Sequence, residues 1–248
     1  MIFIKNDKEI NLMREAGKIV AETLLLIEKK VRPGITTAEL DRIAEEFITK
    51  HGARPSFKGL YDFPASLCIS VNEQVVHGIP GGYALKDGDI ISVDCGAYLN
   101  GFHGDAARTF GVGNISEEAR RLIEVTKESF FKGIEYAKVD NRLTDISHGI
   151  QSYIESQGFS VVRDFVGHGI GRVVHEDPEV PNFGKPGKGP RLVKGMALAI
   201  EPMVNAGDYK VKTLNDDWTV VTRDGSLSAH YENTIVILPD GPEILTLI

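Results

Sequence analysis

Apolar side chains recur at intervals of three and four residues along the first fifty positions of the chain. The first stripe predicts a helix over residues 7–31, which Pro33-Gly34 ends. A second helix begins at a capping box formed by Thr36 and Glu39, and Gly52 ends it.

Shorter segments rich in β-branched residues follow these helices, separated by turns that contain Gly, Pro and Asn. They predict strands in the segments SLCISVN, QVVHGI, DIISVDCGAYL and FHGDAARTFGV. The pattern then restarts, with a long helix over residues 116–137 and a shorter one over residues 144–155. Four further strand-like segments complete the second series: FSVVRDFVG, MALAIEPMV, WTVVTRD and HYENTIVIL.

Two halves therefore share one order of elements: long helix, short helix, strands. Sequence identity between the halves is negligible, and no composition shift marks a linker. We interpret residues 1–248 as a single domain, with halves of roughly residues 1–112 and 113–248. A functional site is expected where the two halves share a sheet.

Two carboxylates stand in an apolar hairpin of the first half. Asn100-Gly101 predicts a two-residue turn, since both positions need positive φ. The turn sets Gly96 opposite Asp105, so Asp94 and Asp105 lie on one face as diagonal neighbours about 7–8 Å apart. With Gly96 between them, we expect the space between the two acids to be empty.

Like charges on a half-buried face require a compensating cation. Arg108 is near in sequence, but the register places it on the other face, which favours a metal ion. The alternative is that both acids are solvated on an open sheet face.

Three further residues of ligand type occupy strand-like positions. His168 stands among glycines, Glu201 follows an apolar run, and Glu232 precedes one. Singly, each would be interpreted as a satisfied core histidine or a strand-end acid. Together with Asp94 and Asp105 they carry −4, which two divalent ions would neutralise. This fairly hard ligand set suits Mn²⁺, Fe²⁺, Co²⁺ or Zn²⁺. Bridging carboxylates would indicate hydrolytic two-metal chemistry.

Composition excludes other function classes. The chain has 248 residues, a net charge of −7 and a pI of about 5.5, which argues against strong nucleic-acid binding or an anionic membrane surface. Two cysteines make no disulfide framework, and no apolar run spans a bilayer. These features predict a cytoplasmic protein.

Four motifs resemble the methionine aminopeptidases, specifically the type I bacterial form. They read SVDCGAYLNGFHGDAARTF, VGHGIGRVVHEDP, GMALAIEPMV and LSAHYENTIVI. The resemblance covers nearly the whole chain, in the order and spacing of that family. It implies an α+β pita-bread (creatinase/aminopeptidase) fold, two pseudo-symmetric halves with a curved antiparallel sheet covered by helices. Only 32 residues separate His168 from Glu201, which leaves no room for the helical insertion of type II enzymes.

The resemblance also implies roles. The metal ligands of the family would correspond to Asp94, Asp105, His168, Glu201 and Glu232. Asp105 and Glu232 would bridge two divalent ions (Co, Mn, Fe or Zn). His175 would hydrogen-bond the scissile carbonyl, His77 would contact the peptide beyond the methionine, and Glu201 would shuttle the proton. A metal-bridged hydroxide would attack the first peptide carbonyl.

The family's apolar methionine pocket would include Phe63, Cys68 and Trp218 here. Without the resemblance, the sequence would favour core packing or a loop position for these three residues and for His77 and His175. Leu60 and Val174 depart from the aromatic residues common in relatives, and Asn233 replaces a histidine.

Removal of the N-terminal methionine from nascent chains, with a small second residue preferred, is the function this resemblance implies. The resemblance also implies a monomeric protein that contacts the ribosome transiently. Two alternatives are a metal-free binding protein on the same fold and a different dimetal hydrolase, such as an X-Pro peptidase.

Overall fold

The computed structural model describes residues 1–248, and the predicted helices form where the apolar stripes lie. Their bounds are α1 (Asp7–Glu28), α2 (Thr37–Lys50), α3 (Glu117–Ile134) and α4 (Leu143–Ser156). The predicted capping box is present, because the Thr36 hydroxyl accepts from the Glu39 amide and the Glu39 carboxylate accepts from the Thr36 amide. Ser116 caps α3. No helix combines the length and hydropathy that crossing a bilayer requires.

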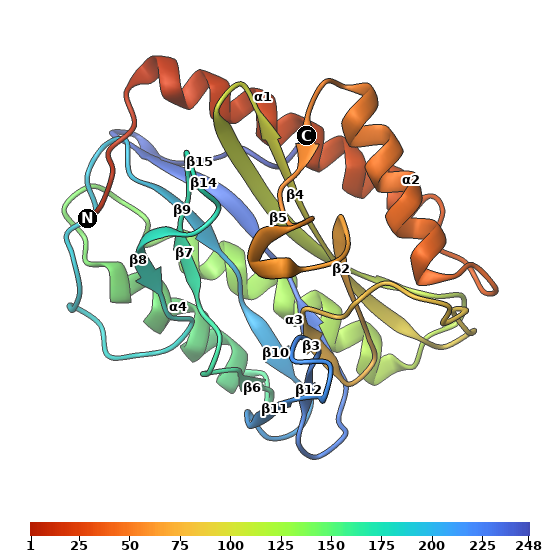
Figure 1. Ribbon diagram of the computed structural model, residues 1–248. Coiled ribbons are helices and arrows are strands. Elements are labelled where there is room, and N and C mark those ends of the chain that lie inside the picture. The colour runs from red at the N-terminus through yellow and green to blue at the C-terminus, as the bar shows by residue number, and fades with distance from the viewer.

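The strands pair antiparallel in four small sheets. One contains β1 (Arg54–Pro55), β2 (Leu67–Val71), β4 (Ile90–Leu99) and β5 (Phe102–Gly111). The largest runs in the order β15 (Gly241–Ile244), β14 (Asn233–Leu238), β9 (Ala197–Ile200), β7 (Gly167–Gly169), β8 (Glu176–Val180). In Figure 1 these strands cross in front of α1, α3 and α4. This arrangement of helices and antiparallel strands agrees with the fold class that the sequence predicts.

Two three-stranded sheets complete the structure. One pairs β13 (Ser228–His230), β10 (Met203–Asn205) and β6 (Ser160–Val161). The other pairs β11 (Val211–Thr213), β12 (Val220–Thr222) and β3 (Gln74–Val76). A 3₁₀ turn, η1 (Leu60–Asp62), precedes β2.

The strand predictions are partly wrong, mostly in the second half. The segment 159–167 forms β6 over only two residues, and β7 begins at its last position. The predicted segments MALAIEPMV and HYENTIVIL are each interrupted at the acid they carry, and four strands lie outside every predicted segment: β1, β8, β11 and β15. They have two to five residues and include proline or several exposed positions, so they carry no alternating pattern for the sequence to reveal.

The hairpin β4–β5 has the predicted register. Asn100 and Gly101 adopt φ of 51° and 92°, and Gly96 pairs with Asp105. The expectation of empty space at Gly96 is wrong. A Cβ there would lie 2.7 Å from Ser56 Cβ and 2.9 Å from Phe57 Cε1, so these side chains pack over the glycine.

Glycines allow α1 to lie against β5. A Cβ on Gly104 would lie 2.8 Å from the Gly17 nitrogen, and a Cβ on Gly17 would lie 2.3 Å from the Leu245 carbonyl oxygen. The backbones of α1, β5 and the segment after β15 therefore approach as closely as glycine permits. Because Asp105 is on β5, this contact sets the position of one of the acids.

Replacing Gly17 with alanine is expected to lower the free energy of unfolding by about 2 kcal/mol, because backbone must move to admit the methyl group. Urea titration of Gly17→Ala checks this. Gly82→Ala is the control, since a Cβ at Gly82 would meet no atom within 4 Å. Equal stability of the two variants would contradict the close-packing argument.

Candidate metal centre

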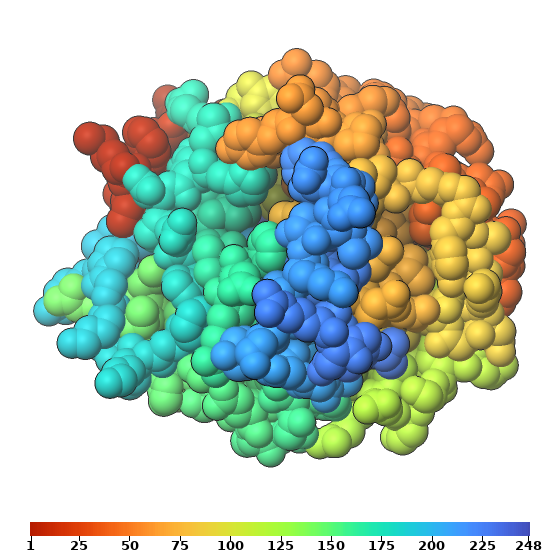
Figure 2. Space-filling view, turned by 60° about the horizontal axis from the view of Figure 1, so that its bottom comes forward, coloured from red at the N-terminus to blue at the C-terminus, as the bar shows by residue number.

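One cavity of about 530 Å³ collects all ten residues that the sequence predicts for the site. They are Phe63, Cys68, His77, Asp94, Asp105, His168, His175, Glu201, Trp218 and Glu232. Figure 2 shows the hollow where the segments around residues 60, 170 and 220 meet. Residues far apart in the sequence therefore face one space.

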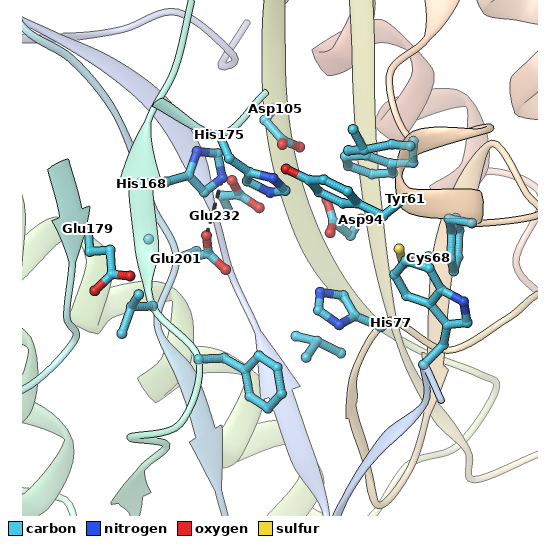
Figure 3. A pocket seen from close by; sticks show the side chains of 18 of the residues that line it. Tyr61, Cys68, His77, Asp94, Asp105, His168, His175, Glu179, Glu201 and Glu232 are labelled. Atoms are coloured by element: carbon cyan, nitrogen blue, oxygen red, sulfur yellow. Dashed lines mark ion pairs between the residues drawn. The ribbon is translucent and has the colours of Figure 1, made fainter. Parts of the chain in front are cut away.

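Four carboxylates reach this cavity from separate strands and strand ends. Asp94 and Asp105 are on neighbouring strands, β4 and β5. Glu201 follows β9, and Glu232 lies between β13 and β14. Figure 3 shows all four groups pointing toward one another from the two sides of the cavity. Asp105 and Glu232 are 3% and 2% exposed, which excludes the solvated-face alternative for this cluster.

The cluster lacks a counter-charge from the chain. No lysine or arginine forms an ion pair with any of the four acids. Asp94 Oδ1, Asp105 Oδ1 and Glu232 Oε1 are buried without a hydrogen-bond partner. Burial raises the pKa of Asp94 to about 7, and burial together with the neighbouring carboxylates raises the pKa values of Asp105 and Glu232 well above their usual range.

Arg108 lies on the opposite face of the sheet, as the register predicts. Its guanidinium donates to the carbonyl oxygens of Ala107 at 2.8 Å and Glu232 at 2.6 Å, and to Asn233 Oδ1 at 2.7 Å. Asn233, the departure noted in the sequence, therefore bonds Arg108 rather than facing the cavity. Arg108 therefore holds the backbone near Asp105 and Glu232 without entering the cluster.

His168 presents a nitrogen ligand to the acids. Its Nδ1 donates to the Gly169 carbonyl oxygen at 2.9 Å, because a carbonyl can only accept. Its Nε2 consequently carries the lone pair and lies 3.6 Å from Glu201 Oε1 (Figure 3). Burial lowers the pKa of His168 to about 3, so the ring is neutral and able to bind a metal.

The donor set fits divalent metal ions. Two groups of ligand atoms lie within 4.8 Å of one another: Asp94 with His230 and Glu232, and Asp105 with His168 and Glu232. Unpartnered carboxylate oxygens, one neutral imidazole aimed at them and a charge of −4 match two doubly charged cations. His230 was not predicted from the sequence. It lies two positions before Glu232, at the spacing that places strand residues on one face, and this was the signal available.

His175 and His77 flank the acids. The His175 ring lies 4.5 Å from the His168 ring, edge to face, and stacks on Tyr61 at 6.0 Å. His77, directly after β3, adopts a φ of 59°, a strained conformation of the kind that gathers at functional sites. Burial lowers the pKa of His175 and brings the pKa of His77 to about 4, so both rings are neutral near pH 7. Tyr61 was also missed, since nothing in the pattern around it marks a site.

An apolar cluster adjoins the acids. Cys68 on β2 pairs with Asp94 across the ladder, and the Phe63 ring meets the Trp218 ring edge to face at 4.9 Å. Val174 and Leu60 pack in the same cluster, so both sequence departures fall on the wall of this apolar space.

Comparison with known proteins gives one consistent family. The sequence profile of metallopeptidase family M24 matches residues 11–239. A methionine aminopeptidase of Clostridium perfringens is 78% identical over 100% of both chains, and methionine aminopeptidase 1 of Bacillus subtilis is 59% identical over 99% of each. The crystal structure of a methionine aminopeptidase from Thermotoga maritima superposes with a TM-score of 0.98 at 48% identity, over 100% of both chains. With a match of this extent, and a cavity whose acids fit divalent cations, the chain belongs to metallopeptidase family M24, among its methionine aminopeptidases.

Proposed function

We infer that this chain is a metal-dependent aminopeptidase that removes the N-terminal methionine from nascent proteins and peptides. The observation that carries this inference is the adjacency of the carboxylate cluster and the apolar cluster within one cavity. The first supplies hydrolytic chemistry, and the second supplies an apolar space with a thiol and aromatic rings, which suits a flexible thioether.

We propose that Asp94, Asp105, His168, Glu201 and Glu232 hold two divalent ions. When bound, such ions polarise the scissile carbonyl and make water a nucleophile near neutral pH. Which metal serves is set by availability as well as by ligand preference.

The residues of the chain perform the remaining tasks. Neutral His175 donates a ring N–H to the carbonyl oxygen as that oxygen gains negative charge. The Glu201 carboxylate accepts the proton of the attacking water and returns it to the leaving amine. Phe63, Cys68 and Trp218 surround the methionine side chain, and His77 contacts the peptide beyond it.

Tyr61 stacks on the His175 ring, and His77 lines the same cavity farther from His175 (Figure 3). The second residue of a substrate would lie in this part of the cavity. We propose that Tyr61 and His77 limit the size of that residue, which accounts for the expected preference for a small one. Cytoplasmic location, a monomeric state and a transient ribosome contact remain predictions. The net charge of −7 favours a local contact with the ribosome over broad RNA binding.

Hydrolysis of Met-Ala-Ser, measured against Ala-Pro in the presence of Mn²⁺ or Co²⁺, tests the function. We expect free methionine from the first peptide and no cleavage of the second. Cleavage of Ala-Pro alone would indicate an X-Pro peptidase, and no cleavage of either with less than one equivalent of bound metal would indicate a binding protein.

His175→Ala is expected to lower kcat by about 100-fold or more, because a hydrogen bond that strengthens in the transition state is lost. Metal affinity, measured by calorimetry on the metal-free protein, should change far less. His148→Ala is the matched control, since His148 is exposed on α4. Unchanged turnover of His175→Ala would remove this residue from the mechanism.

Metal removal is expected to make stability fall as pH rises. The raised pKa values mean that the folded metal-free protein retains protons that the unfolded chain releases above about pH 4, so unfolding releases protons. The free energy of unfolding therefore decreases as pH rises through the Asp94 pKa of about 7 and continues to fall while the other acids ionise.

Thermal melts in chelator from about pH 7 to about pH 8 measure this, above the range where the buried histidines contribute. Bound Mn²⁺ should raise the melting temperature and reverse the trend, because the cation replaces the protons. Asp105→Asn in chelator should show a weaker pH dependence, because the pKa of Asp105 is raised well above its usual range and this carboxyl still holds its proton over that interval. A melting temperature that rises with pH in the metal-free protein would contradict the burial of these acids.

A further inference from the structure

His230 is a second histidine at the carboxylate cluster, and nothing in the proposed mechanism uses it. Its side chain is 2% exposed. Its Nε2 lies 3.7 Å from Glu201 Oε2 and 3.8 Å from Glu232 Oε2, and this nitrogen has no hydrogen-bond partner. A buried polar atom left without a partner is costly, so its presence at this point needs a reason.

Ordinary packing does not supply that reason. The backbone of His230 is fully engaged: its N–H donates to Thr109 Oγ1 at 2.9 Å, and its carbonyl accepts from the same hydroxyl at 2.9 Å. The residue also pairs with Met203 across the ladder between β13 and β10. These bonds fix where the ring stands, and the ring is aimed at two carboxylates at distances beyond a hydrogen bond.

The spacing is close to that of two ligands of one metal ion. Bonds of about 2.1 Å at the tetrahedral angle place ligand atoms about 3.4 Å apart. His168 Nε2 stands 3.6 Å from Glu201, and His230 Nε2 stands 3.7 Å from the other oxygen of the same carboxylate. The two imidazoles therefore flank Glu201 at matching distances.

The donors also divide into two sets that share Glu232. One set is Asp105, His168 and Glu232, and the other is Asp94, His230 and Glu232. Each set contains two carboxylates and one imidazole, with all ligand atoms within 4.8 Å. A centre built from the five predicted ligands alone would leave one of the two ions without a nitrogen ligand.

We propose that His230 is a sixth ligand residue of the metal centre and coordinates the second ion through Nε2. This deepens the proposed function and rests on its metal centre. Two imidazoles make the donor set softer, which favours Zn²⁺, Co²⁺ or Fe²⁺ at the second position over an all-oxygen cation such as Mg²⁺.

Nitrogen-15 NMR on the full chain tests the proposal without an activity assay. The chain contains seven histidines, which ¹⁵N-histidine labelling makes visible. After metal removal and loading with two equivalents of ¹¹³Cd²⁺, each coordinated imidazole nitrogen is split by the cadmium spin. We expect two split nitrogens, from His168 and His230. His230→Gln should remove one of them and weaken the second Cd²⁺ binding step by about 10- to 100-fold in calorimetry.

His103→Gln is the matched control. His103 is a partly buried histidine whose Nδ1 bonds Ser56 Oγ at 2.9 Å, and it lies outside both ligand sets. It should retain both split nitrogens and both binding steps.

A single split nitrogen, lost in His168→Gln and retained in His230→Gln, would overturn the proposal and leave His230 as a hydrogen-bonding neighbour. That outcome would not affect the metal centre itself, whereas the absence of any split nitrogen would contradict the proposed function as well. Should His230→Gln not fold, the number of split nitrogens in the unaltered protein decides the question.

Discussion

The structure depends on bringing four carboxylates together out of water with no basic side chain paired to them. Each group raises the proton affinity of the others, and the buried oxygens of Asp94, Asp105 and Glu232 lack hydrogen bonds. In the absence of a compensating charge this arrangement opposes folding, since burial of unpaired charge is among the most costly interactions in a protein. Divalent cations remove the cost, so the same feature that weakens the metal-free chain creates its affinity for metal.

The scaffold holds these groups by fixing their backbones. Ala107 and Glu232 exchange two backbone hydrogen bonds, at 3.0 and 3.3 Å. The Thr234 hydroxyl accepts from the Asp105 amide at 3.0 Å and donates to the Asp105 carbonyl at 2.9 Å. Arg108 joins the same segments from the other face of the sheet. The proposed ligands Asp105 and Glu232 therefore stand on segments tied together by bonds that do not use their carboxylate atoms, which leaves those atoms free for a cation.

Much of this site could be predicted from the sequence, because a hairpin turn determines the register of the two strands that carry Asp94 and Asp105. The Asn100-Gly101 turn places Asp94 and Asp105 on one face, and the structure has that pairing. The packing of Phe57 over Gly96 could not be predicted, because a loop supplies it and no periodicity relates the two. His230 could have been found from its spacing to Glu232, but one buried histidine is more often a core residue. What identifies it is the distance to Glu201, which depends on how β13 and β9 are placed in space.

The ladder that positions the acids also places the proposed methionine pocket beside them. Cys68 and Asp94 are partners across β2 and β4, so the apolar wall and a proposed metal ligand are adjacent cross-strand neighbours, about 5 Å apart at Cβ. In the proposed function, a methionine side chain seated against Cys68 would therefore bring its own carbonyl, two bonds from the side chain, to the acids.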